Sequence, residues 1–168
     1  MSKLDKAIEQ VLFENNIPNE WSSEINNELD QLKSETNSSR ADLTDKPFIT
    51  IDGKDAKDFD DAVFCENKDS NIILWVAIAD VAEIVTEGSK IDLEAFKRGT
   101  SIYFPKNVVP MLPEKISNNL CSLVPNEKRN VLVCKIKFHD DGEINSYEFI
   151  EAFISVSYTH LTLPTTSK

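Results

Sequence analysis

Five aspartates crowd into ten residues of this chain, at positions 52, 55, 58, 60 and 61. Apolar residues flank the group on both sides, at 48–51 and at 62–64. Carboxylates held beside buried strands lose hydration and repel one another, and a bound cation relieves both costs. The stretch therefore indicates metal-assisted phosphodiester chemistry.

The spacing of these aspartates suggests how they could meet. Asp58 and Asp60 are two residues apart, so an extended backbone points both side chains to one face. Asp61 points away unless the chain bends there, and Asp52 can return to the same place through a turn at Gly53. Hard divalent cations prefer carboxylate oxygens, and two ions about 4 Å apart can activate a water and stabilise a leaving oxygen. Four aspartates suit such a pair of ions, whereas one or two do not.

Three other interpretations of the acidic stretch compete. A calcium-binding EF-hand loop needs Gly at its sixth position and Glu at its twelfth, where a count from Asp52 finds Lys57 and Val63, so we reject it. A DxD-type phosphatase would use Asp58 and Asp60 as nucleophile and acid, but it needs an apolar strand just before them, and residues 54–57 do not form one. A solvated acidic loop stays open on composition alone.

Charge and cysteine usage limit the class of protein. The chain has 168 residues, 40% of them apolar, and a formal net charge of −11, which suits one domain or part of a larger one. This charge argues against bulk electrostatic capture of a polyanion, so RNA would need a local basic groove, metal ions or further sequence. Three widely spaced cysteines without a CxxC pair, and no apolar signal core, predict a reduced cytoplasmic protein without a zinc site.

Local patterns predict a mixed α+β fold. Helices are expected over 3–15 with Ser2 as N-cap, from Ser22 or Ser23 onwards, and over 91–98 up to Gly99. Strands are expected at 48–51, 60–65 and 72–79, the last covered on both faces, and a hairpin at 131–138 and 144–154. Prolines between 105 and 125 predict irregular structure there. A helical lead-in followed by mixed, largely antiparallel strands does not suit repeated βαβ units.

Several sequence blocks together resemble the opening of the catalytic domain of the ribonuclease II/ribonuclease R family. Their order and spacing match the family over residues 40–155. The blocks are Arg-Ala-Asp-Leu at 40–43, Thr-Ile-Asp-Gly-x-Asp-Ala-x-Asp-Phe-Asp-Asp-Ala-Val at 50–63, Trp-Val-Ala-Ile-Ala-Asp-Val at 75–81, Arg-Gly-Thr-Ser-x-Tyr-Phe-Pro at 98–105, Pro-Met-Leu-Pro-Glu at 110–114 and Ser-Asn-x-Leu-Cys-Ser-Leu at 117–123.

The resemblance implies a processive 3′→5′ exoribonuclease that takes the single-stranded 3′ end of RNA and releases nucleoside 5′-monophosphates with Mg²⁺. The family's four catalytic aspartates fall on Asp52, Asp58, Asp60 and Asp61. We assign all four to the metal site, and we expect Asp60 to be the most sensitive to substitution. Tyr103 matches the aromatic residue that stacks on a base near the cleaved end, a contact that tolerates any base. Without the resemblance, Tyr103 could also be a core aromatic.

The resemblance also gives expectations for the whole chain. Residues 1–39 look like the helical segment that follows the cold-shock domains of ribonuclease R, and residues 98–101 lean towards ribonuclease R without excluding ribonuclease II. The family's catalytic domain continues far beyond residue 155, with further RNA contacts, and an S1 domain follows. We therefore expect residues 40–155 to be the N-terminal part of a truncated catalytic domain, monomeric and inactive alone. A metal- or RNA-binding fragment without catalysis is the alternative.

Residues 156–168 depart from the family pattern. Their sequence matches an in-frame translation of a transposon adapter used in DNA sequencing, so we expect a non-native tail that packs poorly. Resequencing of the locus should show the reading frame continuing, and a genomic stop codon after Lys168 would contradict this hypothesis.

Two further polar residues have open roles. Asp80, at the end of an expected buried strand, should be hydrogen-bonded and structural. Arg98 could meet a phosphate or cap a helix end.

Overall fold

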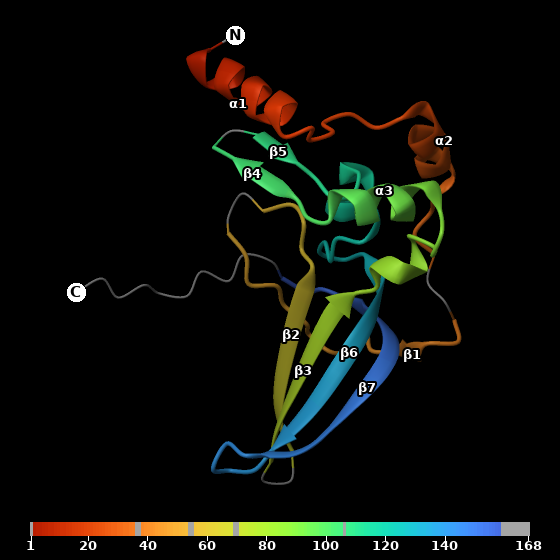
Figure 1. The fold of residues 1–168 in the computed structure, drawn as a ribbon. Coiled ribbons are helices and arrows are strands. Elements are labelled where there is room, and N and C mark those ends of the chain that lie inside the picture. The colour runs from red at the N-terminus through yellow and green to blue at the C-terminus, as the bar shows by residue number, and fades with distance from the viewer. Residues whose placement is uncertain (1, 36–37, 54–55, 69–70, 106, 159–168) are drawn as a thin grey trace, which may run out of the picture. The chain divides into compact units, whose positions relative to one another are not determined.

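The computed structural model describes residues 2–35, 38–53, 56–68, 71–105 and 107–158 (Figure 1). The chain divides into two compact units, each built from two separate stretches. Met1–Leu32 joins Val85–Lys115 in the first unit, and Lys33–Ile84 joins Ile116–Lys168 in the second. The helical lead-in therefore shares a unit with a stretch that the resemblance assigns to the catalytic domain.

The three helices of the first unit begin at serines that cap them. α1 Lys3–Glu14, α2 Ser23–Gln31 and α3 Lys90–Arg98 each follow a serine whose side chain accepts a backbone N–H of the first turn. α3 ends at Gly99, whose φ of 69° is a left-handed conformation that glycine adopts without strain. The three predicted helices are confirmed. No helix in the described part of the chain is long and apolar enough to cross a membrane.

A short hairpin completes the first unit. β4 Ile102–Phe104 pairs with β5 Asn107–Val109 in antiparallel fashion. The prediction of irregular structure between 105 and 125 is therefore partly wrong, and a π-helical turn at Ile116–Leu120 corrects it further. Prolines can flank a short strand without preventing it, because residues at the ends of a strand need not donate a backbone hydrogen bond to the neighbouring strand. One apolar cluster joins α1 to this hairpin, made of Ile8, Leu12, Ile17, Ile102, Phe104 and Val109.

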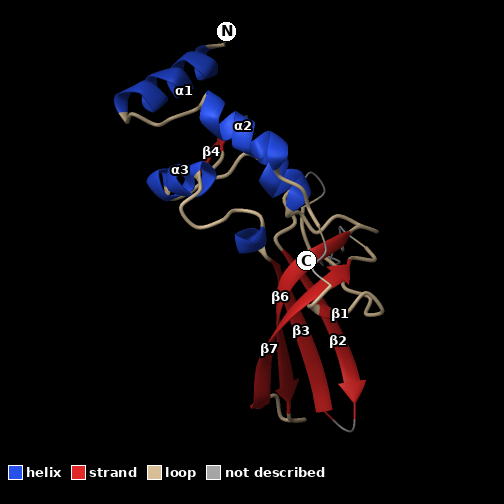
Figure 2. Ribbon diagram, turned by 90° about the vertical axis from the view of Figure 1, so that its right-hand side faces the viewer, coloured by secondary structure: helices blue, strands red, loops and turns tan. Residues whose placement is uncertain are grey.

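The second unit is a five-stranded sheet in the order β1-β7-β6-β3-β2 (Figures 1 and 2). All neighbouring strands are antiparallel except β1 and β7. The predicted α+β class and the hairpin of β6 and β7 are confirmed, and residues 66–68, expected in a loop, extend β2. The strands are β1 Ala41–Asp42, β2 Asp61–Lys68, β3 Asn71–Ala79, β6 Lys128–Phe138 and β7 Ile144–Ser155.

The sheet buries one face and exposes apolar side chains on the other. Ala62, Ala77 and Val133 are paired across three strands and are fully buried. On the opposite face Ile78 pairs with Leu132, and the two side chains are 48% and 45% exposed. The prediction that residues 72–79 are covered on both faces is therefore wrong. A continuous apolar run shows that both faces are apolar, not that both are covered.

Residues 48–51 do not form the predicted strand. Ile49 makes only isolated bridges, antiparallel to Val63 and parallel to Tyr158. Phe48 and Thr50 on either side of it are nevertheless fully buried. The apolar pattern thus reports burial correctly, although no ladder extends beyond one residue.

The end of the described chain packs against this segment. Val156 is 1% exposed, and the hydroxyl and N–H of Ser157 both donate to the Phe48 carbonyl. The expectation of poor packing is therefore wrong for Val156, whereas Ser157 and Tyr158 bond to this segment but stay exposed. Residues 159–168 lie outside the described residues.

Candidate active site

One antiparallel bridge returns the start of the acidic stretch to its centre. Ile49 and Val63 exchange two backbone hydrogen bonds, of 3.0 and 2.8 Å. Asp52 follows Ile49 by three residues and Asp60 precedes Val63 by three, so this antiparallel bridge turns the two segments that carry them toward each other. This pairing gives a physical reason for Asp52 to approach the other carboxylates.

Asp60 is affected by the charges of the other three aspartates. The pKa of Asp60 is raised above its usual range, first by partial burial and then by the charges of Asp58, Asp61 and Asp52. Like charges raise a carboxyl pKa, so the charges of Asp58, Asp61 and Asp52 disfavour the ionised form of Asp60. Asp58, Asp60 and Asp61 nonetheless remain exposed, which leaves them open to solvent and limits the shift.

Phe59 anchors the chain between two of the aspartates. It is 5% exposed, whereas Asp58 and Asp60 are exposed. This alternation is that of an extended backbone, in which Asp58 and Asp60 leave the same side and Phe59 the other.

A second segment holds the backbone of this acidic stretch. The N–H of Phe59 donates to Ser122 Oγ (3.1 Å), and the Ser122 hydroxyl donates to the Lys57 carbonyl (2.8 Å). The N–H of Leu123 donates to the Phe59 carbonyl (2.9 Å). The position of the aspartates therefore depends on residues far along the sequence.

Arg129 on β6 supports Ser122 in turn. Its Nε donates to the Ser122 carbonyl (3.0 Å) and its Nη2 to the Asn119 carbonyl (3.1 Å), while the residue is 6% exposed. The sequence interpretation assigned no role to Ser122 or Arg129. A polar residue between the apolar Cys121 and Leu123 was the available signal, because a buried hydroxyl requires partners.

Two neighbours of the site have structural roles. Burial raises the pKa of the Cys121 thiol to about 11, with Asp60 and Asp80 adding to the rise and the positive charge of Arg129 opposing it. Asp80 accepts a bond from Arg40 Nη2 (2.7 Å), which confirms that Asp80 is hydrogen-bonded. Burial opposes the charge of Arg40, but its bonds to Asp80 and Glu83 outweigh that effect and raise the guanidinium pKa.

The donor chemistry of the acidic group fits a hard divalent cation. Mg²⁺ takes oxygen ligands, and a positive charge beside Asp60 would lower its raised pKa. The side chains do not close into a cage, since among the described residues no three His, Cys, Asp or Glu stand together as metal ligands. Repulsion among four like charges opposes such closure. Asp55, the fifth aspartate, lies outside the described residues.

Tyr103 and Arg98 belong to the first unit. Tyr103 on β4 is 71% exposed, so it is not a core aromatic. The Arg98 side chain is 3% exposed, binds Glu94 (3.1 Å) and two backbone carbonyls, and lies over the ring of Trp21. Arg98 is thus occupied in packing, and its interpretation as a phosphate ligand is wrong.

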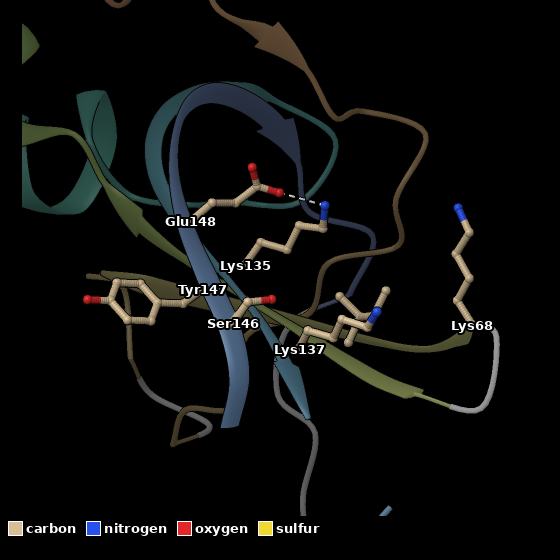
Figure 3. A pocket seen from close by; sticks show the side chains of 7 residues that line it. Lys68, Lys135, Lys137, Ser146, Tyr147 and Glu148 are labelled. Atoms are coloured by element: carbon tan, nitrogen blue, oxygen red, sulfur yellow. Dashed lines mark hydrogen bonds and ion pairs between the residues drawn. The ribbon is translucent and has the colours of Figure 1, made fainter. Parts of the chain in front are cut away.

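A hollow of about 440 Å³ lies at the far end of the sheet (Figure 3). Lys68, Lys135 and Lys137 line it, but Lys135 is bound to Glu148 (2.6 Å). β2 has 8 residues from Asp61 to Lys68 and is about 23 Å long, which separates the hollow from the aspartates. Acidic residues 140, 141 and 143 in the β6–β7 turn reduce the positive potential nearby. The hollow is therefore a weak candidate for binding a polyanion.

Comparison with known proteins gives a consistent family likeness. A family model described as RNB domain matches residues 40–162. Ribonuclease R of Buchnera aphidicola subsp. Acyrthosiphon pisum (strain APS) is 46% identical over 155 residues, covering 88% of this chain and 21% of the relative. Ribonuclease R of Escherichia coli (strain K12) is 45% identical over 161 residues, covering 93% of this chain and 20% of the relative.

Solved structures give the same likeness. Mycoplasma genitalium RNase R in complex with ribose methylated single-stranded RNA matches with a TM-score of 0.87 at 38% identity, covering 92% of this chain and 25% of that one. The chain therefore spans about a fifth of the length of the curated relatives it matches.

Proposed function

Since the chain belongs to the RNB domain family, we propose that it forms part of a 3′→5′ exoribonuclease that hydrolyses RNA to nucleoside 5′-monophosphates with Mg²⁺. The observation that carries the proposal is that exposed Asp58 and Asp60 leave the same side of a backbone held in place by Ser122, and the charges of neighbouring aspartates that raise the pKa of Asp60 support it. A group of mutually repelling carboxylates at the solvent surface is costly without a function, and it suits metal-assisted attack on a phosphodiester.

In this proposal Asp52, Asp58, Asp60 and Asp61 hold the metal, and each acts in its ionised form. Mg²⁺ held by these carboxylates would supply Lewis-acid activation of an attacking water and stabilisation of the leaving oxygen. Because Asp58, Asp60 and Asp61 are exposed, the 3′ end of an RNA strand has room to approach them. Burial and the neighbouring charges raise the pKa of Asp60, so a bound cation would favour its ionised form.

Tyr103 completes the proposal as a stacking surface for a base near the cleaved end. Its exposed ring on a short hairpin is available for stacking, which does not discriminate between bases. The partner is then the single-stranded 3′ end of RNA. Free thiols at Cys65, Cys121 and Cys134 are compatible with a reducing cytoplasm.

A chimera tests the activity. The present chain replaces the matching fifth of Escherichia coli Ribonuclease R, and the product is given a 3′-tailed RNA with Mg²⁺. We expect release of nucleoside 5′-monophosphates, and we expect Asp60→Asn to abolish it while RNA binding persists. The 168-residue chain alone should release none, because it spans so little of its relatives.

The same assay addresses the alternatives. A folded chimera that binds RNA but yields no mononucleotides would replace the enzyme proposal with a non-catalytic binding role. A DxD-type phosphatase would instead hydrolyse a small phosphomonoester such as p-nitrophenyl phosphate and ignore RNA, and Asp58→Asn would abolish that reaction.

A further inference from the structure

We propose that Ser122 is a positioning residue that fixes Asp58 and Asp60 for metal binding. This inference rests on the proposed function, because it concerns the same carboxylates. Ser122 itself is not offered as a ligand: its hydroxyl is already bonded to the backbone of the acidic segment, as donor and as acceptor.

Ser122 fixes the two peptide planes that flank Asp58. The Lys57 carbonyl belongs to the plane before Asp58, and it accepts from the Ser122 hydroxyl (2.8 Å). The Phe59 N–H belongs to the plane after Asp58, and it donates to the same oxygen (3.1 Å). Because peptide units are planar, holding both planes sets the direction in which the Asp58 side chain leaves the backbone. Ser122 is 0% exposed, so water cannot easily replace these bonds.

The residue after Ser122 extends this support to Asp60. The Leu123 N–H donates to the Phe59 carbonyl (2.9 Å), which belongs to the peptide plane before Asp60. The Ala79 N–H donates to the Asp60 carbonyl (2.9 Å), in the plane after it. Both aspartates therefore have bonded peptide planes on each side, and adjacent residues, Ser122 and Leu123, supply three of the four bonds.

Arg129 ties this support to the sheet. Through its bonds to the carbonyls of Ser122 and Asn119, β6 limits how far the segment can shift. Ligands must be held within roughly 0.5 Å of the productive geometry, and loss of a group that orients a ligand typically lowers metal affinity by about 10- to 100-fold. Ser122 is thus placed to change metal affinity without touching the metal.

The test uses the 168-residue chain and Mg²⁺ itself. Ser122→Ala removes both hydroxyl bonds, and Ser122→Cys keeps the side-chain size while weakening them, in case the alanine variant does not fold. We expect the Kd for Mg²⁺ in calorimetry to rise about tenfold. Amide hydrogen exchange at Phe59, followed by NMR, should accelerate about tenfold.

Ser101→Ala is the matched control. Its hydroxyl also accepts a backbone N–H, that of Met111 (2.9 Å), but in the unit that does not carry the aspartates. This variant loses a comparable bond, so a merely structural effect would appear in it too. We expect its Mg²⁺ affinity and its Phe59 exchange to equal those of the native chain.

Asp60→Asn separates failure of this inference from failure of the proposed function. If Asp60→Asn weakens Mg²⁺ binding and a folded Ser122 variant does not, the positioning role alone is overturned. Unchanged exchange at Phe59 in the Ser122 variants also overturns it. If the native chain does not bind Mg²⁺ at all, the proposed metal site fails and the role of Ser122 falls with it.

Discussion

Asp60 lies among three aspartates whose charges, together with burial, raise its pKa. When a carboxyl pKa is higher in the folded state, stability that is complete below about pH 4 is lost as the pH rises through the folded-state value. Asp60→Asn should therefore raise the melting temperature near neutral pH in EDTA, with the gain vanishing towards about pH 4. Because solvent screens this exposed side chain, we expect a gain of about 1 °C in a circular dichroism melt.

Asp42 provides a control, because its pKa is shifted in the direction opposite to that of Asp60. Hydrogen bonds from the hydroxyl and N–H of Thr44 lower the pKa of Asp42, so its ionised form favours the folded state. Asp42→Asn should consequently give no rise in melting temperature at neutral pH. A rise of equal size in both variants would show that loss of any negative charge is responsible, since the net charge is −11.

Tyr103 allows a test at a single ring. In the chimeric enzyme, Tyr103→Ala should raise KM for a short single-stranded RNA about tenfold, because stacking contributes about 1–3 kcal/mol per base. Tyr103→Phe should keep the native KM, since the ring alone does the stacking. Tyr147→Ala is the matched control, being a tyrosine that is 66% exposed on β7. Equal effects of the two alanine variants would remove the specific role of Tyr103.

The end of α3 depends on one backbone conformation. Gly99 has a φ of 69°, and a Cβ built there would meet no atom within 4 Å, so substitution carries only a conformational cost. Gly99→Ala should lower the free energy of unfolding by about 1 kcal/mol in urea titrations. Gly53 is equally open but has no left-handed φ, and Gly53→Ala should change that free energy by less than about 0.5 kcal/mol. Equal losses would contradict this explanation.

Elements with strong local signals were predictable from sequence. Ser2, Ser22 and Gly99 mark helix ends through bonds or conformations within a few residues, and the β6–β7 hairpin has its turn between two apolar runs. The β4–β5 hairpin was missed because its strands are three residues each and border prolines. So short a pairing is maintained by packing against α1, which no local pattern reports.

The sequence pointed to the acidic stretch of the candidate site, but it did not reveal the contacts that hold this stretch in place. Composition and spacing pointed to the acidic stretch, and the family resemblance chose Asp52, Asp58, Asp60 and Asp61 within it, an assignment that stays a prediction. The hydroxyl of Ser122 reaches the acidic segment across 63 positions of sequence. Contacts of that separation depend on how the sheet is assembled, so spacing alone does not reveal them.

The exposed face of the sheet is a property of the whole second unit. Cross-strand pairing lines up side chains of four strands on one face, and several of them are about half exposed or more. An uncovered apolar surface of this extent is unusual for a folded chain by itself and favours association. The exposed apolar members of this face are Ile72, Ile78, Leu132, Ile144, Tyr147 and Phe149, and the exposed Asp61 and Glu151 lie beside them.

The folded 168-residue chain should therefore bind the dye ANS and scatter light increasingly with concentration. Replacing Leu132 and Phe149 by serine should reduce the dye fluorescence several-fold with little loss of stability, because the two side chains are already 45% and 67% exposed. Phe96→Ser is the control, since Phe96 is 87% exposed but lies on α3, in the other unit. Fluorescence that falls as much in the control as in the double variant would mean that scattered apolar residues, and not this face, bind the dye.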